Sequence, residues 1–298
     1  MIFGTQLNAG SFETFLNDKY YFSCTNLNNF NRKLVNAKNS NTVKQPLVYF
    51  TGCSYTFGMG VSDSLTYVSL AAQKLLDKRL VNFAIPGFGT IQTYLLLKEK
   101  IEKNDIMRPD ILIYNFMSFH VSRNLIPSDY TSILIDGVLL TENKMDLQQI
   151  NPKEIKQIFP SVFFKNDELT IRNYNFEELL KMEFPYKRVF PLCNFLSNFK
   201  DKMNKKEQIE ITKKLLLEIN EICKNDDIKF YISIMESAML ESSDWKLFFE
   251  ENGIKMMDLT FDTKSKDAYL QIDKFHPSEK SHKIIADKLI REIELIND

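Results

Sequence analysis

The stretch that decides the fold is "PLVYFTGCSYTFGMG", residues 46–60. Its first part, 46–52, is a short run of β-branched and aromatic residues between a proline and a glycine, which predicts a buried strand. Three of the chain's nine glycines then surround Ser54, namely Gly52, Gly58 and Gly60. One glycine is enough to end a strand, so three indicate that the backbone comes close to another group at this point.

Four further apolar runs alternate with amphipathic helices along the chain. The five predicted strands cover 46–52, 80–85, 109–117, 227–235 and 254–261. The predicted helices cover 64–78, with Ser64 as its N-cap, and 90–103, 206–224, 242–253 and 277–295. Alternation of this kind implies parallel strands joined by helices that cover both faces of the sheet. We therefore expect an α/β fold, a three-layer α/β/α sandwich around a central parallel five-stranded sheet.

Two stretches fall outside this alternation. Residues 1–44 are polar, Asn-rich and weakly patterned, and we expect an extended lead-in packed on the domain. The domain itself is expected over 45–298. Within it, residues from about 125 to 205 contain many prolines and aromatics and predict an insertion of mixed structure.

The composition excludes several classes of protein. The 298 residues carry a net charge of −1, from 38 basic and 39 acidic side chains, so we expect no nucleic-acid partner. No apolar run approaches the roughly 20 residues that span a bilayer, and the N-terminus lacks the pattern of a signal peptide, which favours a cytoplasmic protein. The four cysteines lie far apart without CxxC spacing and are interpreted as buried or free thiols, although two disulfides stay open. With three histidines, no cysteine pairs and no HExxH motif, the sequence indicates no metal site, and we expect no cofactor.

Ligands of parallel α/β sheets bind beyond the carboxyl ends of the strands. Four segments follow predicted strands: "GCSYTFGMG" (52–60), "NFAIPGFGT" (82–90), "SFHVSRN" (118–124) and "DKFHPSEKSH" (273–282).

These segments resemble, in order, the sequence blocks of the SGNH hydrolase superfamily, also called GDSL esterases and lipases. Residues 52–58 are similar to its Gly-Asp-Ser-x-Thr-x-Gly block, with Cys53 in place of the aspartate. Residues 82–87 match its Asn-x-x-x-x-Gly turn, and 273–276 match the Asp-x-x-His that precedes its final helix. The resemblance covers 46–124 and 227–296, and it implies the flavodoxin-like SGNH hydrolase fold and a Ser-His-Asp triad.

The residue types suit nucleophilic catalysis. A serine hydroxyl needs a base, and the histidine imidazole titrates in the neutral range, so His276 would activate Ser54. Asp273, three residues earlier, would fix the tautomer of His276. The backbone amides of Ser54 and Gly87 would form the oxyanion hole, where glycine permits a close approach.

One block departs from the family pattern. The resemblance implies Gly-x-Asn-Asp after the central strand, where the asparagine is an oxyanion donor, but the chain has "MSFH" with Phe119 at the asparagine position. His120 is the candidate substitute, supported by Arg123 or Asn124, and a substrate contact or a packed core role stays open. The direction of the Asn115 side chain is also open.

Three functions follow from this pattern. The first is a serine esterase that hydrolyses a small-molecule or glycan ester through an acyl-enzyme, and the habit of the family suggests an O-acetyl group on a carbohydrate. The second is an acyltransferase that uses the same triad. The third is a catalytically impaired binding module, which the replacement at Phe119 favours.

Overall fold

The computed structural model describes residues 10–16, 19–26, 32, 34, 45–102, 109–142, 147–182 and 205–297. The chain divides into two compact units. One, here called the sheet unit, contains Asn8–Pro86, Leu97–Ser118 and Asn220–Asp298. The other, here called the insert unit, contains Met1–Leu7, Gly87–Leu96 and Phe119–Ile219.

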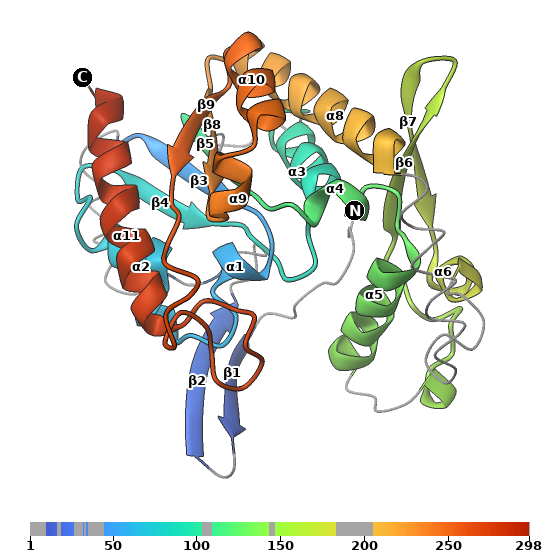
Figure 1. Ribbon diagram of the computed structural model, residues 1–298. Helices are drawn as coiled ribbons and strands as arrows, with labels where there is room; N and C mark the ends of the chain where they lie inside the picture. Colours follow the sequence, from blue (N-terminus) through green and yellow to red (C-terminus); the bar gives the residue numbers. More distant parts are fainter. Residues whose placement is uncertain are drawn as a thin grey trace. The chain divides into compact units, whose positions relative to one another are not determined.

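The sheet unit is built on the five predicted strands, all parallel, in the order β4-β3-β5-β8-β9 (Figure 1). Their bounds are β3 Leu47–Thr51, β4 Arg79–Asn82, β5 Ile111–Phe116, β8 Lys229–Ile234 and β9 Lys255–Asp258. Every residue of β3 and β5 is buried, as the continuous apolar runs of these strands predict. The register sets Thr51 beside Tyr114 and Phe116 beside Ile234, so these strands end at one edge.

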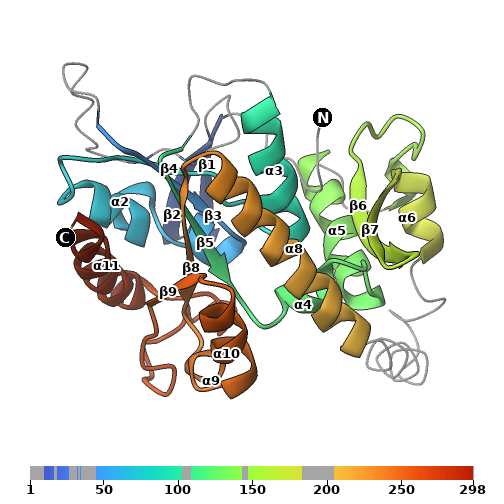
Figure 2. The ribbon, with the colours of Figure 1, turned by 90° about the horizontal axis from the view of Figure 1, so that it is seen from above.

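Helices cover both faces of this sheet (Figure 2). Helices α2 (Tyr67–Ala72) and α11 (Glu279–Glu294) lie on one face and contact each other. The C-terminal ends of α3 (Thr90–Glu102) and α8 (Lys205–Asn225) belong to the same unit and lie on the other face. The short α9 (Ser237–Leu240) and α10 (Ser243–Glu251) complete the unit. The expected three-layer sandwich around a five-stranded parallel sheet is confirmed.

The first predicted helix differs from its expected bounds. A 3₁₀ turn covers Asp63–Leu65, and α2 begins only at Tyr67. The N-cap is Thr66, whose side chain accepts a hydrogen bond from the amide of Ser69 at 3.3 Å, so the prediction of Ser64 as the cap was wrong. Thr66 takes this place because its extended backbone separates the two helical turns.

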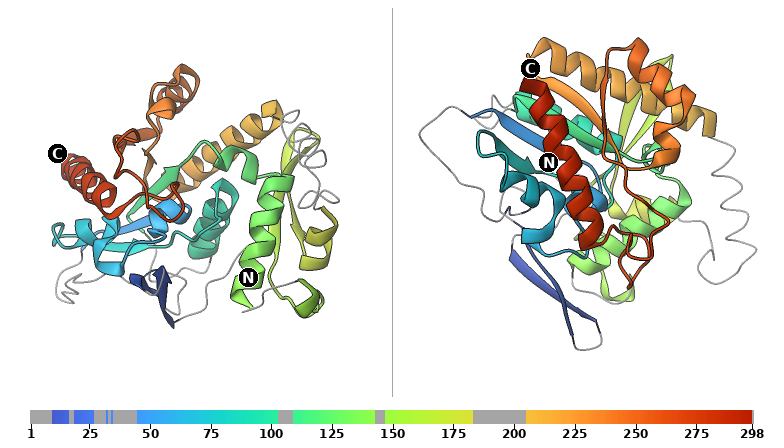
Figure 3. Two further views of the ribbon diagram at one scale, coloured as in Figure 1. Left: turned by 60° about the horizontal axis from the view of Figure 1, so that its bottom comes forward. Right: turned by 60° about the vertical axis from the view of Figure 1, so that its left-hand side comes forward.

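The first 44 residues contain an antiparallel hairpin that the sequence did not suggest. Strands β1 (Gly10–Leu16) and β2 (Lys19–Asn26) pair along their length (Figure 3). Beyond the hairpin, Arg32 forms an antiparallel bridge with Asn82 at the end of β4. The domain boundaries expected at residue 45 and around the insertion stay predictions.

The insert unit has the mixed structure expected of residues 125–205, as far as the described residues extend. It contains α4 (His120–Arg123), α5 (Ser128–Thr141), a 3₁₀ turn at Leu147–Gln149, strands β6 (Phe159–Lys165) and β7 (Glu168–Tyr174), and α6 (Phe176–Met182). Helix α5 and the β6–β7 hairpin lie beside each other (Figure 3). Apolar residues of α5, β6 and α6 share one buried core that includes Ile135, Phe159 and Phe176.

Candidate active site

Ser54 is the first residue of a single helical turn, α1 (Ser54–Phe57), which begins just beyond the end of β3. Cys53 is its N-cap, and Gly58 ends it in the left-handed conformation with φ 80°. The amides of Gly58 and Met59 both donate to the Ser54 carbonyl oxygen, at 3.0 and 2.9 Å. The turn therefore closes on the backbone of Ser54 itself.

The glycines of this turn serve contacts with the protein's own residues. Gly52 has φ 146°, and a Cβ atom there would lie 2.8 Å from the Thr56 hydroxyl and 3.2 Å from Asn115. At Gly58, a Cβ atom would lie 2.6 Å from the methyl group of Thr66. A side chain at either position would be both crowded and strained, so the close approach expected from the sequence is intramolecular at these two residues.

A chain of hydrogen bonds joins the three predicted catalytic residues, all in the sheet unit. Nε2 of His276 lies 2.9 Å from Oγ of Ser54, and Nδ1 of His276 lies 2.6 Å from Oδ2 of Asp273. Because an ionised carboxylate only accepts, Nδ1 carries the proton and Nε2 offers its lone pair to the serine hydroxyl. Ser54 is 8% exposed, so the residue is largely buried and its hydroxyl is held by the bond to His276.

Asp273 is fixed by the loop that carries it. Its Oδ1 accepts from the amides of Phe275 and His276, at 2.9 and 3.0 Å. Partial burial raises the pKa of the carboxyl, but the hydrogen bonds from the His276 ring and these two amides outweigh burial and hold the pKa below its usual range. Asp273 is therefore a carboxylate at neutral pH, as the role of orienting a histidine requires.

Tyr55 connects the serine turn to the histidine loop. Its hydroxyl donates to the carbonyl oxygen of Phe275 at 2.8 Å, and its ring lies 5.4 Å from that of Phe275 and 5.8 Å from that of His276. Burial raises the pKa of Tyr55, so the hydroxyl stays protonated as a donor. Tyr55 was not predicted as a site residue, because a tyrosine next to the serine has no motif of its own.

The remaining oxyanion candidates, Gly87 and His120, belong to the insert unit and stay predictions. Gly87 has φ 86°, and its carbonyl oxygen accepts from the Tyr130 hydroxyl at 2.6 Å. His120 is fully buried with its ring edge-on to Phe119, and this burial, followed by the charge of Arg123, lowers the pKa of His120 well below the usual range. The imidazole is therefore neutral.

The residues expected to support His120 have structural partners. Arg123 donates to the Phe88 carbonyl at 2.8 Å. Asn124 accepts from the amide of Ile91 at 3.1 Å and donates to Thr212 at 2.8 Å. In the sheet unit, the Asn115 amide points to β8 and donates to the carbonyl oxygen of Ser233 at 3.2 Å.

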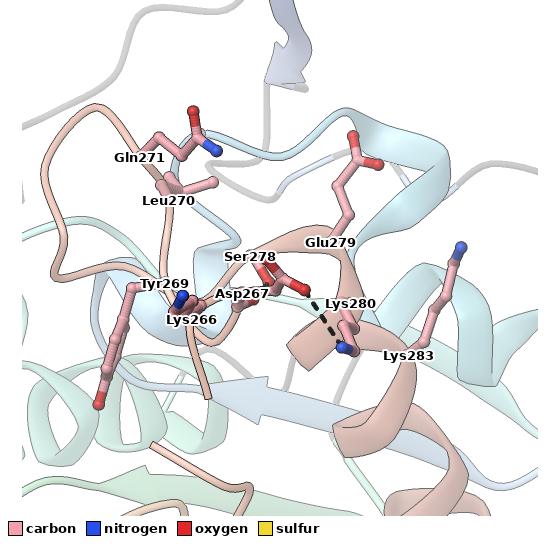
Figure 4. Close-up of a pocket in the computed structure, with 10 residues that line it drawn as sticks. Lys266, Asp267, Tyr269, Leu270, Gln271, Ser278, Glu279, Lys280 and Lys283 are labelled. Carbon is pink, nitrogen blue, oxygen red and sulfur yellow. Dashed lines mark hydrogen bonds and ion pairs between the residues drawn. The ribbon is translucent and has the colours of Figure 1, made fainter. Parts of the chain in front are cut away.

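A hollow of about 500 Å³ lies on the loop before His276 and the start of α11 (Figure 4). Its lining mixes three lysines with two carboxylates, and Lys280 pairs with Asp267 at 3.3 Å. Ser54, Asp273 and His276 are not among the residues that line it. Within the described part of the chain, no three His, Cys, Asp or Glu side chains are grouped to hold a metal ion. Over the same residues, no helix combines the length and apolar character that crossing a membrane requires.

No known family model matches the chain, and no curated protein matches it by sequence. Among solved structures, the psychrotrophic esterase EstA from Pseudoalteromonas sp. is 12% identical with a TM-score of 0.47, over 85% of this chain and 100% of that one. A member of the lipolytic G-D-S-L family from Veillonella parvula is 10% identical with a TM-score of 0.43, over 82% of this chain and 96% of that one. At these values the likeness carries no functional argument. The fold therefore rests on the strand order, and the site rests on its own distances.

Proposed function

We propose that the protein is a serine esterase that hydrolyses a carboxylic ester through an acyl-enzyme. The observation that carries this proposal is the unbroken hydrogen-bond chain from Ser54 through His276 to Asp273. A nucleophile, a base within hydrogen-bond reach and a group that orients the base are the parts that acyl transfer needs.

The geometry supports the following sequence of steps. Oγ of Ser54 attacks the ester carbonyl carbon while Nε2 of His276 takes the hydroxyl proton. The tetrahedral adduct collapses, the alcohol leaves with the proton from His276, and the acyl group stays on Ser54. A water molecule then attacks the acyl-enzyme, with His276 again as base, and releases the carboxylic acid. Asp273 stays ionised throughout and stabilises the imidazolium.

The oxyanion hole is proposed around the first turn of α1. The amide of Ser54 lies at the start of this turn, where backbone N–H groups have no partner within the helix. Gly87 and His120 are the proposed second and third donors. As the substrate we propose a small acyl ester, such as an O-acetyl group on a carbohydrate, which the family resemblance suggests.

Hydrolysis of p-nitrophenyl acetate tests the proposal, with Ser54→Ala and His276→Ala beside the wild type. We expect turnover by the wild type and its loss by roughly 10³-fold or more in both variants, because the nucleophile and the base act as a unit. Circular dichroism and the melting temperature establish that each variant is folded.

A covalent probe gives an independent readout. A fluorophosphonate should label the wild type at Ser54, located by peptide mass, and should leave Ser54→Ala unlabelled. A folded wild type that neither turns over the ester faster than its variants nor reacts with the probe would contradict the esterase. Labelling without hydrolysis, together with acetyl transfer to an added sugar, would instead favour the acyltransferase.

A further inference from the structure

Arg32 is a fully buried cation outside the four blocks that carry the candidate site. Its Nε donates to the carboxylate of Asp63 at 2.8 Å. Its Nη1 donates to the carbonyl oxygens of Phe57 and Gly58, and its Nη2 to that of Val61, each at 2.5 Å. The guanidinium also lies over the Phe57 ring, 4.7 Å from its centre. The Arg32 side chain therefore contacts Phe57, Gly58, Val61 and Asp63 in the segment that follows Ser54.

The carbonyl groups of Phe57 and Gly58 lie at the end of α1, where a helix leaves its last carbonyl oxygens without partners inside the helix, and Val61 follows in the same segment. The amide of Gly58, whose carbonyl Arg32 holds, donates to the Ser54 carbonyl oxygen at 3.0 Å. Along these hydrogen bonds, Gly58 is therefore the single residue between the Arg32 guanidinium and the backbone of Ser54. Asp63 supplies the carboxylate that makes a buried positive charge tolerable.

We infer that Arg32 is a positioning residue that fixes the turn carrying Ser54, and that Asp63 orients it. The inference rests on the proposed function for its kinetic part. The planar fork of a guanidinium reaches several carbonyl oxygens in fixed directions, whereas a lysine ammonium is a point charge on a flexible stem. Charge alone is therefore insufficient, and Arg32→Lys should not restore the geometry.

The test compares Arg32→Lys, Arg32→Met and Asp63→Asn with Lys78→Met as the matched control. Lys78 is also a buried basic residue of the sheet unit, paired with Asp77 at 2.6 Å, but it precedes β4 and lies at the opposite end of the strands from Ser54. Activity on p-nitrophenyl acetate is measured well below each melting temperature. Hydrogen exchange of the peptide covering 54–61 is followed by mass spectrometry.

We expect Arg32→Met and Arg32→Lys to lower kcat roughly 10- to 100-fold with KM within about twofold, because misplacement of a reacting group by an ångström has an effect of this size. Exchange in 54–61 should become at least about tenfold faster, since the amides of Gly58 and Met59 lose their fixed geometry. Asp63→Asn should give a smaller change in the same direction. Lys78→Met should lower the melting temperature and leave both readouts at wild-type values.

Two results overturn the inference. The first is wild-type exchange of 54–61 in both Arg32 variants, whatever their activity. The second is faster exchange with kcat within about twofold of the wild type. A third result separates the two proposals. If exchange of 54–61 becomes faster in the Arg32 variants but the wild type shows no turnover that depends on Ser54, the proposed esterase function is contradicted, while the positioning of the turn by Arg32 is supported.

Discussion

At the scale of single residues, the hydrogen bond between Asp273 and His276 can be tested by one substitution. In Asp273→Asn an amide NH₂ can face Nδ1, which favours the tautomer whose Nε2 carries a proton and cannot accept one from Ser54. We expect kcat to fall by about 10³- to 10⁴-fold with little change in the melting temperature. Asp267→Asn, an exposed aspartate of the same loop, should keep wild-type turnover. Comparable turnover in the two variants would contradict the role of Asp273.

Tyr55 makes a smaller prediction of the same kind. Tyr55→Phe keeps the ring contacts and removes the hydrogen bond from the Tyr55 hydroxyl to the Phe275 carbonyl. We expect a loss of about 1 kcal/mol in the free energy of unfolding and a several-fold lower kcat, because His276 adjoins Phe275. Urea unfolding and steady-state kinetics measure both. Tyr174→Phe, on β7 of the insert unit, is the control, and equal effects on kcat in the two variants would refute the prediction.

At the scale of elements, the junction of β3 and α1 depends on Gly52. Gly52→Ala introduces a Cβ atom 2.8 Å from the Thr56 hydroxyl at a backbone φ of 146°. We expect about 2 kcal/mol or more of destabilisation, from strain and crowding together, and a loss of kcat as the turn shifts. Gly253→Ala provides the comparison, because Gly253 also has positive φ, 63°, but nothing lies within 4 Å of the added atom. Gly253→Ala should lower the free energy of unfolding by about 1 kcal/mol and leave kcat unchanged.

Thermal unfolding and p-nitrophenyl acetate turnover check this pair. A Gly52→Ala variant as active as Gly253→Ala would show that the turn tolerates displacement. It would also weaken the view that the backbone near Ser54 is held in a single geometry.

The elements also show what the sequence could and could not predict. The five strands were predictable because their apolar runs are continuous and bounded by turn residues. The hairpin of β1 and β2 was missed because "GSFETFL" and "KYYFSCTN" do not alternate strictly between apolar and polar residues and lie in an Asn-rich stretch. Asp273 and His276 are three residues apart and form a local motif. Arg32 left no such signal, since most of its partners are backbone carbonyls that any sequence supplies.

At the scale of the whole molecule, His282 joins two helices of the sheet unit. It lies on α11, fully buried, and its Nδ1 accepts from the amide of Tyr67 on α2 at 3.1 Å while the two rings stack at 5.8 Å. Burial, followed by the charges of Arg32 and His276, lowers the pKa of His282 to about 3. The folded state therefore keeps this imidazole neutral over a range where the unfolded chain protonates it.

The sign of the pH effect follows from the two pKa values. Unfolded His282 titrates near 6.5, so at higher pH neither state binds the proton and stability is fully present. As pH falls from about 6.5 towards 3, only the unfolded state binds it, and stability drops by about 1.4 kcal/mol per pH unit for this residue. His282→Gln should remove that slope while lowering stability at neutral pH.

The fluorescence of Trp245 allows the pH dependence of stability to be measured for the sheet unit, which contains His282. Trp245 is the only tryptophan of the sequence and stacks on Phe249 within the sheet unit, so its fluorescence follows the unfolding of the part that holds His282. His120 is also buried with a lowered pKa, but it belongs to the insert unit, which makes His120→Gln the matched control. Urea unfolding midpoints are measured at pH 7.5, 6.5 and 5.5. The midpoints of wild type and His282→Gln should approach each other as the pH falls, because only the wild type loses stability when His282 of the unfolded chain is protonated. Parallel midpoints would mean that the protonation of His282 does not govern the acid sensitivity of the sheet unit.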